Sequence, residues 1–64
     1  MDKDVSSLDR LIAMTAEEIG ELQYWMSRSQ GVPQVVYMAV SVRLSERREF
    51  LVTVQELRSS IVSH

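Results

Sequence analysis

Ser29-Gln30-Gly31-Val32-Pro33 divides this 64-residue chain into two halves, and the chain holds only two glycines and one proline. Glycine adopts the left-handed conformation that ends many helices, and proline is tolerated in the first turn of a new helix. The sequence therefore predicts one domain, 1–64, with a helix over about 5–29, a turn over 30–33 and a helix over about 34–62. Asp4 or Ser6 is expected to cap the first helix, ahead of which the chain frays.

Hydrophobic periodicity defines the faces of the two helices. Ahead of the turn, alternating spacings of three and four are typical of a coiled-coil seam. Its positions are Val5, Leu8, Ile12, Thr15, Ile19, Leu22, Met26 and Ser29. The expected core consists of Leu8, Leu11, Ile12, Ile19 and Leu22 from the first helix and Val40, Leu44, Leu51, Val54 and Ile61 from the second. Gly20, inside the first helix, is expected to permit close helix packing.

The apolar run from Val35 to Val42 leaves two alternatives open, because its β-branched residues also suit a strand. A strand here could pair only with its copy in a dimer, since the chain offers no second strand. The run continues into Arg43 to Glu49 without a turn, which favours a helix.

A short turn makes consecutive helices antiparallel neighbours. Folding the chain at the turn brings an acidic cluster against a basic one. The expected pairs are Glu21 with Arg43, Glu17 with Arg47, and Glu18 beside Arg48. These charges select the register of an all-α, antiparallel αα-hairpin.

Apolar residues beyond the shared seam predict that the hairpin dimerises into a four-helix bundle. They are Leu11, Met14 and Trp25 beside the first seam and Val35, Met38, Val42 and Val52 beside the second. A chain this short has a marginal core, and without cysteine it cannot form disulfides. A homodimer is the first expectation, and a different helical partner is the second.

Catalysis has few candidate groups. Cysteine is absent, the lone histidine is His64, and Glu17, Glu18 and Glu21 lack the Glu-x-x-His partner of bundle metal sites. We expect no enzyme, metal or cofactor. The net charge of −2 disfavours general attraction to nucleic acid, and the longest apolar run is too short to span a membrane. No signal peptide is evident, so the expected location is cytoplasmic.

The aromatic and methionine residues near the turn suit an interaction surface. They are Tyr24, Trp25, Met26, Tyr37 and Met38. Either they close the dimer core or they dock another protein. The size and shape are similar to small helical-hairpin co-chaperones, adaptors and inhibitors, and a protein-interaction module is the leading hypothesis. The alternatives are a DNA-binding regulator that uses Arg43, Arg47 and Arg48, and a structural subunit of a larger assembly.

Overall fold

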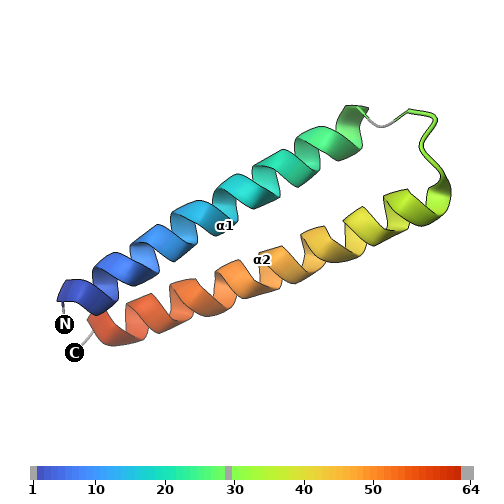
Figure 1. Cartoon of the computed structure of the whole chain (residues 1–64). Helices are drawn as coiled ribbons and strands as arrows, with labels where there is room; N and C mark the ends of the chain where they lie inside the picture. Colours follow the sequence, from blue (N-terminus) through green and yellow to red (C-terminus); the bar gives the residue numbers. More distant parts are fainter. Residues whose placement is uncertain (1, 29, 63–64) are drawn as a thin grey trace.

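The computed structural model describes residues 2–28 and 30–62, and these form two helices joined by a turn. Helix α1 runs over Asp2–Arg28 and helix α2 over Gln34–Val62. The helices lie antiparallel, side by side, in a rod of 49 × 14 × 12 Å with both ends of the chain at one end (Figure 1). The predicted all-α hairpin is confirmed, and so is the helical alternative for residues 35–42. The predictions for Met1, Ser29 and His64 concern positions outside the described residues.

The start of α1 corrects the sequence prediction. The helix begins at Asp2, so Asp4 and Ser6 lie within it rather than capping it, and residues 2–4 are helical rather than frayed. Acidic residues are stabilised in the first turn by the positive end of the helix dipole, and Asp4 lies there.

The turn has the backbone conformation that its residues predict. Gly31 has a φ of 82°, in the left-handed region. Pro33 directly precedes α2, where its carbonyl oxygen accepts hydrogen bonds from the N–H groups of Val36 and Tyr37 at 3.0 and 3.2 Å. Proline thus starts α2 at its N-terminal boundary, where its missing N–H costs no helical hydrogen bond.

The packing between α1 and α2 follows one seam on each helix. All described seam positions of α1 are buried or half-buried, namely Val5, Leu8, Ile12, Thr15, Ile19, Leu22 and Met26. On α2 the shielded positions at the same spacing are Val40, Leu44, Arg47, Leu51, Val54, Arg58 and Ile61. Among the described side chains only Thr15, Leu44 and Val54 are buried. The Thr15 hydroxyl donates to the carbonyl oxygen of Leu11 at 2.8 Å, which satisfies this buried polar group within its own helix.

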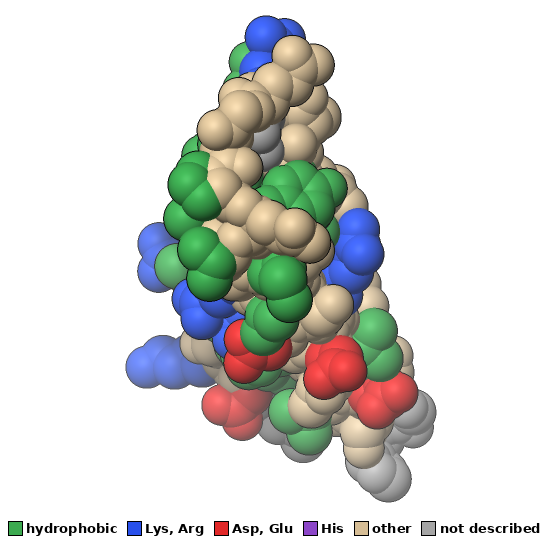
Figure 2. All heavy atoms as spheres, turned by 90° about the vertical axis from the view of Figure 1, so that its right-hand side faces the viewer, with side chains coloured by type: hydrophobic (Ala, Val, Ile, Leu, Met, Phe, Trp, Pro, Cys, Tyr) green, Lys and Arg blue, Asp and Glu red, His purple; other side chains and the backbone are tan. Residues whose placement is uncertain are grey.

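The seam stops short of the turn. Residues 34–39 of α2 are all exposed, and the first shielded position of this helix is Val40. Val35 and Met38 are 74% and 57% exposed. Figure 2, which looks onto the turn end, shows hydrophobic side chains of the molecule gathered there at the surface. The turn half of the hairpin therefore carries apolar surface that neither helix covers.

Candidate functional site

An ion cluster joins the two helices near their middle, with Glu18 as its acceptor. Arg43 donates from Nε to Oε2 of Glu18 at 3.2 Å, and its Nη2 lies 3.2 Å from the same oxygen. Nη1 of Arg47 lies 3.9 Å from Oε1 of Glu18. One carboxylate therefore serves two arginines, each on an adjacent turn of α2.

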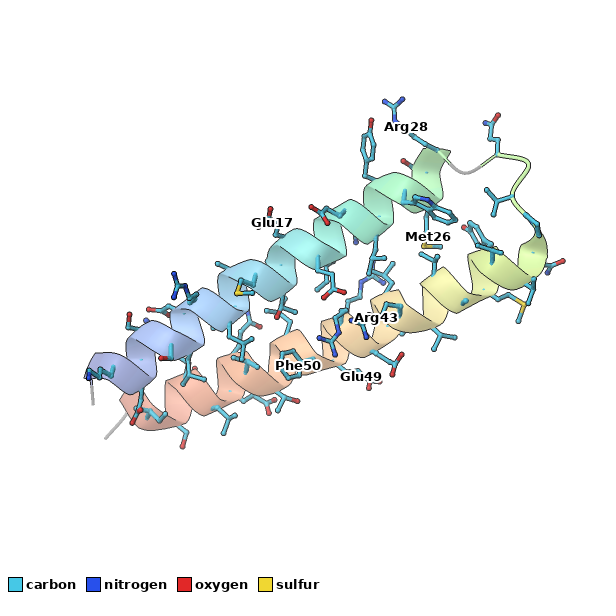
Figure 3. All side chains as sticks on the ribbon, in the orientation of Figure 1. Glu17, Met26, Arg28, Arg43, Glu49 and Phe50 are labelled. Atoms are coloured by element: carbon cyan, nitrogen blue, oxygen red, sulfur yellow. The ribbon has the colours of Figure 1, made fainter. Side chains whose placement is uncertain are left out.

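These pairs differ from the predicted ones by one turn or less. Glu17, expected to meet Arg47, points away from α2 (Figure 3), and Glu21 is exposed without an ion pair to any described residue. Consecutive helical residues are rotated by about 100°. With Ile19 and Leu22 in the seam, Glu18 flanks it whereas Glu17 and Glu21 face outward. The prediction from the sequence placed the charges in the right region but did not take this rotation into account.

Arg47 occupies a seam position that the sequence prediction did not include. Its guanidinium lies over the Phe50 ring, 4.8 Å from the centroid, while its Nε is buried with no hydrogen-bond partner. A half-buried arginine with an unsatisfied N–H weakens a seam that is otherwise mostly apolar. This arrangement occupies Arg43 and Arg47 within the hairpin, so only Arg48 of the three is free of ion pairs with described residues.

A second ion pair links the helices near the chain ends. Arg58 donates to both carboxylate oxygens of Asp9, with Nη2 at 3.5 Å from Oδ2. The hydrogen bond, and then the negative charge of Asp9, raise the pKa of the Arg58 guanidinium above its ordinary value. Because the pKa is raised, the full contribution of this exposed pair to folding stability is present below the ordinary arginine pKa. It is lost only as the pH rises through the raised pKa.

An open groove of about 700 Å³ lies along the side of α1 that faces away from α2. It is lined by Glu17, Gly20, Glu21, Tyr24, Trp25 and Arg28 of α1 and by Gln30 and Val32 of the turn. The α1 residues recur at spacings of three and four, which places them on one helical face. Nothing lies within 4 Å of where a Gly20 side chain would begin. Gly20 therefore hollows the groove, and it does not mediate close packing between α1 and α2.

The groove combines aromatic, apolar and charged groups. The Arg28 guanidinium lies over the Tyr24 ring, 4.7 Å from its centroid, and Figure 3 shows Arg28 directed away from α2. Glu17 and Glu21, one helical turn apart, place two carboxylates on the same face. The surface can thus hold an apolar side chain against the rings and a cationic one against the carboxylates.

The five predicted partner-binding residues are divided between the groove, the seam and the exposed part of α2. Tyr24 and Trp25 line the groove, at 61% and 38% exposure. Met26 is a half-buried seam residue that points toward α2 (Figure 3). Tyr37 and Met38 are exposed on α2 and do not line the groove. Sequence reasoning missed the groove residues other than Tyr24 and Trp25, although the spacing from Glu17 to Arg28 could have indicated their shared face.

The described residues were also compared with the requirements of a metal site and of a membrane span. Residues 2–28 and 30–62 contain no cluster of three His, Cys, Asp or Glu side chains able to hold a metal ion. Within the same ranges neither helix has the length and hydropathy needed to cross a bilayer. Comparison of the chain with protein-family models, curated proteins and solved structures found no match.

Proposed function

We propose that the chain is a non-enzymatic protein-interaction module, which acts as a helical-hairpin homodimer and binds a target protein at its turn end. The observation that carries this proposal is the exposure of large hydrophobic side chains on both helices toward the turn, among them Tyr24 on α1 and Val35, Met38 and Val42 on α2. Exposed apolar patches on small proteins mark interaction sites more often than single exposed side chains do.

The residues that line the groove indicate the chemistry of the target segment that it would bind. Trp25 and Val32 offer apolar contact, while Glu17 and Glu21 offer acceptors for a lysine or arginine. An amphipathic helix that carries an apolar residue and a basic residue one turn apart fits this combination, because helix-in-groove recognition uses side chains at such spacings. The proposed target is therefore a protein with a basic amphipathic helix.

The DNA-binding alternative has less support. A phosphate contact is favoured by an arginine whose charge no carboxylate already neutralises. Arg43 and Arg47 are engaged by Glu18, and Arg47 is also half-buried against Phe50. A DNA phosphate would therefore compete with the Glu18 carboxylate, which joins the two helices.

Photo-crosslinking in the cells that naturally make the protein tests the target site. A photoreactive phenylalanine analogue replaces Tyr24 in the groove or, as a control, Gln55, which is exposed on the polar side of α2. We expect a heterologous adduct from position 24 and none from position 55. Gly20→Leu fills the groove and should abolish the adduct, whereas Ala16→Leu, also on an exposed part of α1, should keep it. Equal adducts from both positions, no adduct at all, or an adduct insensitive to Gly20→Leu would contradict the proposed site.

A further inference from the structure

One side of the two-helix layer carries a row of residues on each helix at a spacing of seven, which is about two helical turns. The rows are Asp4, Leu11, Glu18 and Trp25 on α1 and Val36, Arg43, Phe50 and Leu57 on α2. The contact between Glu18 and Arg43 at 3.2 Å places both rows on the same side of the layer. Arg47 joins them, since it reaches both Glu18 and the Phe50 ring. We call these two rows the heptad face.

The heptad face is mainly apolar toward both ends, with Asp4 as the exception near the chain ends, and it is ionic in the middle. Near the chain ends it holds Leu11, Phe50 and Leu57, and Met14 adjoins them at 60% exposure. Near the turn it holds Trp25 and Val36, both of which are exposed. Phe50 and Leu11 remain half-buried. Large apolar side chains thus lie on both sides of the ion cluster along this face.

The other side of the layer is polar or lined by small residues. Asp9 lies nine residues from Glu18, or about two and a half turns, and therefore on the opposite side of α1. The corresponding rows are Asp9, Ala16 and Gln23 on α1 and Ser41, Arg48, Gln55 and Val62 on α2. Only Val62, at the end of its row, is a large apolar residue. The row that flanks the seam on this side therefore suits water, although Met38 and Val52 adjoin it, whereas the heptad face carries most of the large apolar residues beside the seam.

The hairpin exposes more surface than a compact monomer of its mass, and the excess is about the area of one covered face. The hairpin exposes 5077 Å², whereas a compact monomer of its 7.4 kDa exposes about 4,200 Å². The difference, roughly 900 Å², is close to the ~800 Å² that each partner buries in a standard protein interface. A second copy of the chain supplies a surface of the same length and the same pattern.

We propose that the heptad face binds the same face of a second copy, with the two turns at the same end of the dimer. Two-fold symmetry allows two ways to stack the layers. With the turns at opposite ends, α1 lies over α1 of the second copy, so the two rows that carry Asp4 and Glu18 meet. With the turns at the same end, α1 lies over α2, so Glu18 meets Arg43 of the second copy and apolar ends meet apolar ends. The Arg43 side chain is 53% exposed and has donors available for this contact.

This arrangement places both grooves at one end of a four-helix bundle and makes the target surface bivalent. It rests on the dimer of the proposed function and adds its face and orientation. Trp25 lies where the heptad face borders the groove, so binding at one groove is adjacent to the dimer contact.

Spin labels report the orientation directly, because the chain has no cysteine of its own. Gln30→Cys, in the exposed turn, is labelled in the full chain, and pulsed electron paramagnetic resonance measures the distance between copies. Turns at the same end give about 20 Å, from packed helices 8–10 Å apart. Turns at opposite ends give a distance near the 49 Å length of the rod. Copies labelled at Gln30→Cys mixed with copies labelled at Ser60→Cys should show the reverse, a long distance.

Two variants test the face itself by sedimentation equilibrium. Leu57→Glu, on the heptad face, should raise the dimer Kd at least about tenfold. Val52→Glu, equally exposed at 52% but on another side of α2, should leave the Kd within about twofold. A dimer with distant turns, or equal sensitivity to both variants, overturns this inference and leaves the proposed dimer standing. A monomer at all concentrations overturns both.

Discussion

Val54 and Val52 are the same residue two positions apart on α2, yet they contribute differently to stability. Val54 is 3% exposed in the seam, and Val52 is 52% exposed. We predict that Val54→Ala lowers the free energy of unfolding by about 2 kcal/mol, through two lost methyl groups and the cavity they leave. Val52→Ala should change it by less than about 0.5 kcal/mol. Urea unfolding followed by circular dichroism measures both, and equal losses would contradict the observed seam.

The two glycines should respond to alanine with opposite signs. Gly20 is helical with open space around it, so Gly20→Ala is expected to stabilise the hairpin by about 0.5–1 kcal/mol. Gly31 has a φ of 82°, and Gly31→Ala should destabilise the hairpin by about 1 kcal/mol because a side chain disfavours this conformation. Thermal unfolding of each variant is the measurement. A loss of stability in Gly20→Ala would mean that Gly20 has neighbours the isolated hairpin does not show.

At the scale of the helix, Arg47 makes the α2 seam less stable than an apolar residue would at that position. This side chain lies in the seam between Leu44 and Leu51 with a buried Nε that has no partner. We predict that Arg47→Met raises the free energy of unfolding by about 1 kcal/mol, because a flexible apolar side chain fills the seam without an unsatisfied donor. Arg48→Met, on the exposed side, serves as the control and should have little effect. A destabilised Arg47→Met would show that its contacts with Glu18 and Phe50 outweigh the buried donor.

Much of each helix could be predicted from its sequence, because an apolar period of three and four leaves few ways to bury a helix. The seam of α1 from Val5 to Met26 follows from that period, and Gly31 with Pro33 defines the turn. The α2 seam is harder to predict, since two of its seven shielded positions are arginines, Arg47 and Arg58. Because of its charge, an arginine is normally assigned to the surface, whereas its long apolar stem allows it to lie along a seam.

The pairing of charges and the groove depend on rotation about the helix axis, which the sequence resolves only once the seam is known. Glu17 and Glu18 differ by one position, yet one lines the groove and the other joins the helices. The groove itself also requires the turn residues Gln30 and Val32 to lie beside α1, a tertiary contact that no local pattern specifies.

For the whole molecule, the decisive property is a core too small for the chain. Of the described side chains three are buried, and no large side chain is fully buried. A two-helix layer has no further element to cover its apolar side, so a second copy is the most economical source of stability. Unfolding of such a dimer depends on concentration, because each molecule that unfolds must first lose its partner.

Sedimentation equilibrium of the full chain over a range of concentrations, together with thermal unfolding of the same samples, tests this most directly. We predict a species of twice the 7.4 kDa chain mass and a Tm that rises with protein concentration. A species of single chain mass at every concentration, with a Tm that does not change, would contradict the dimer.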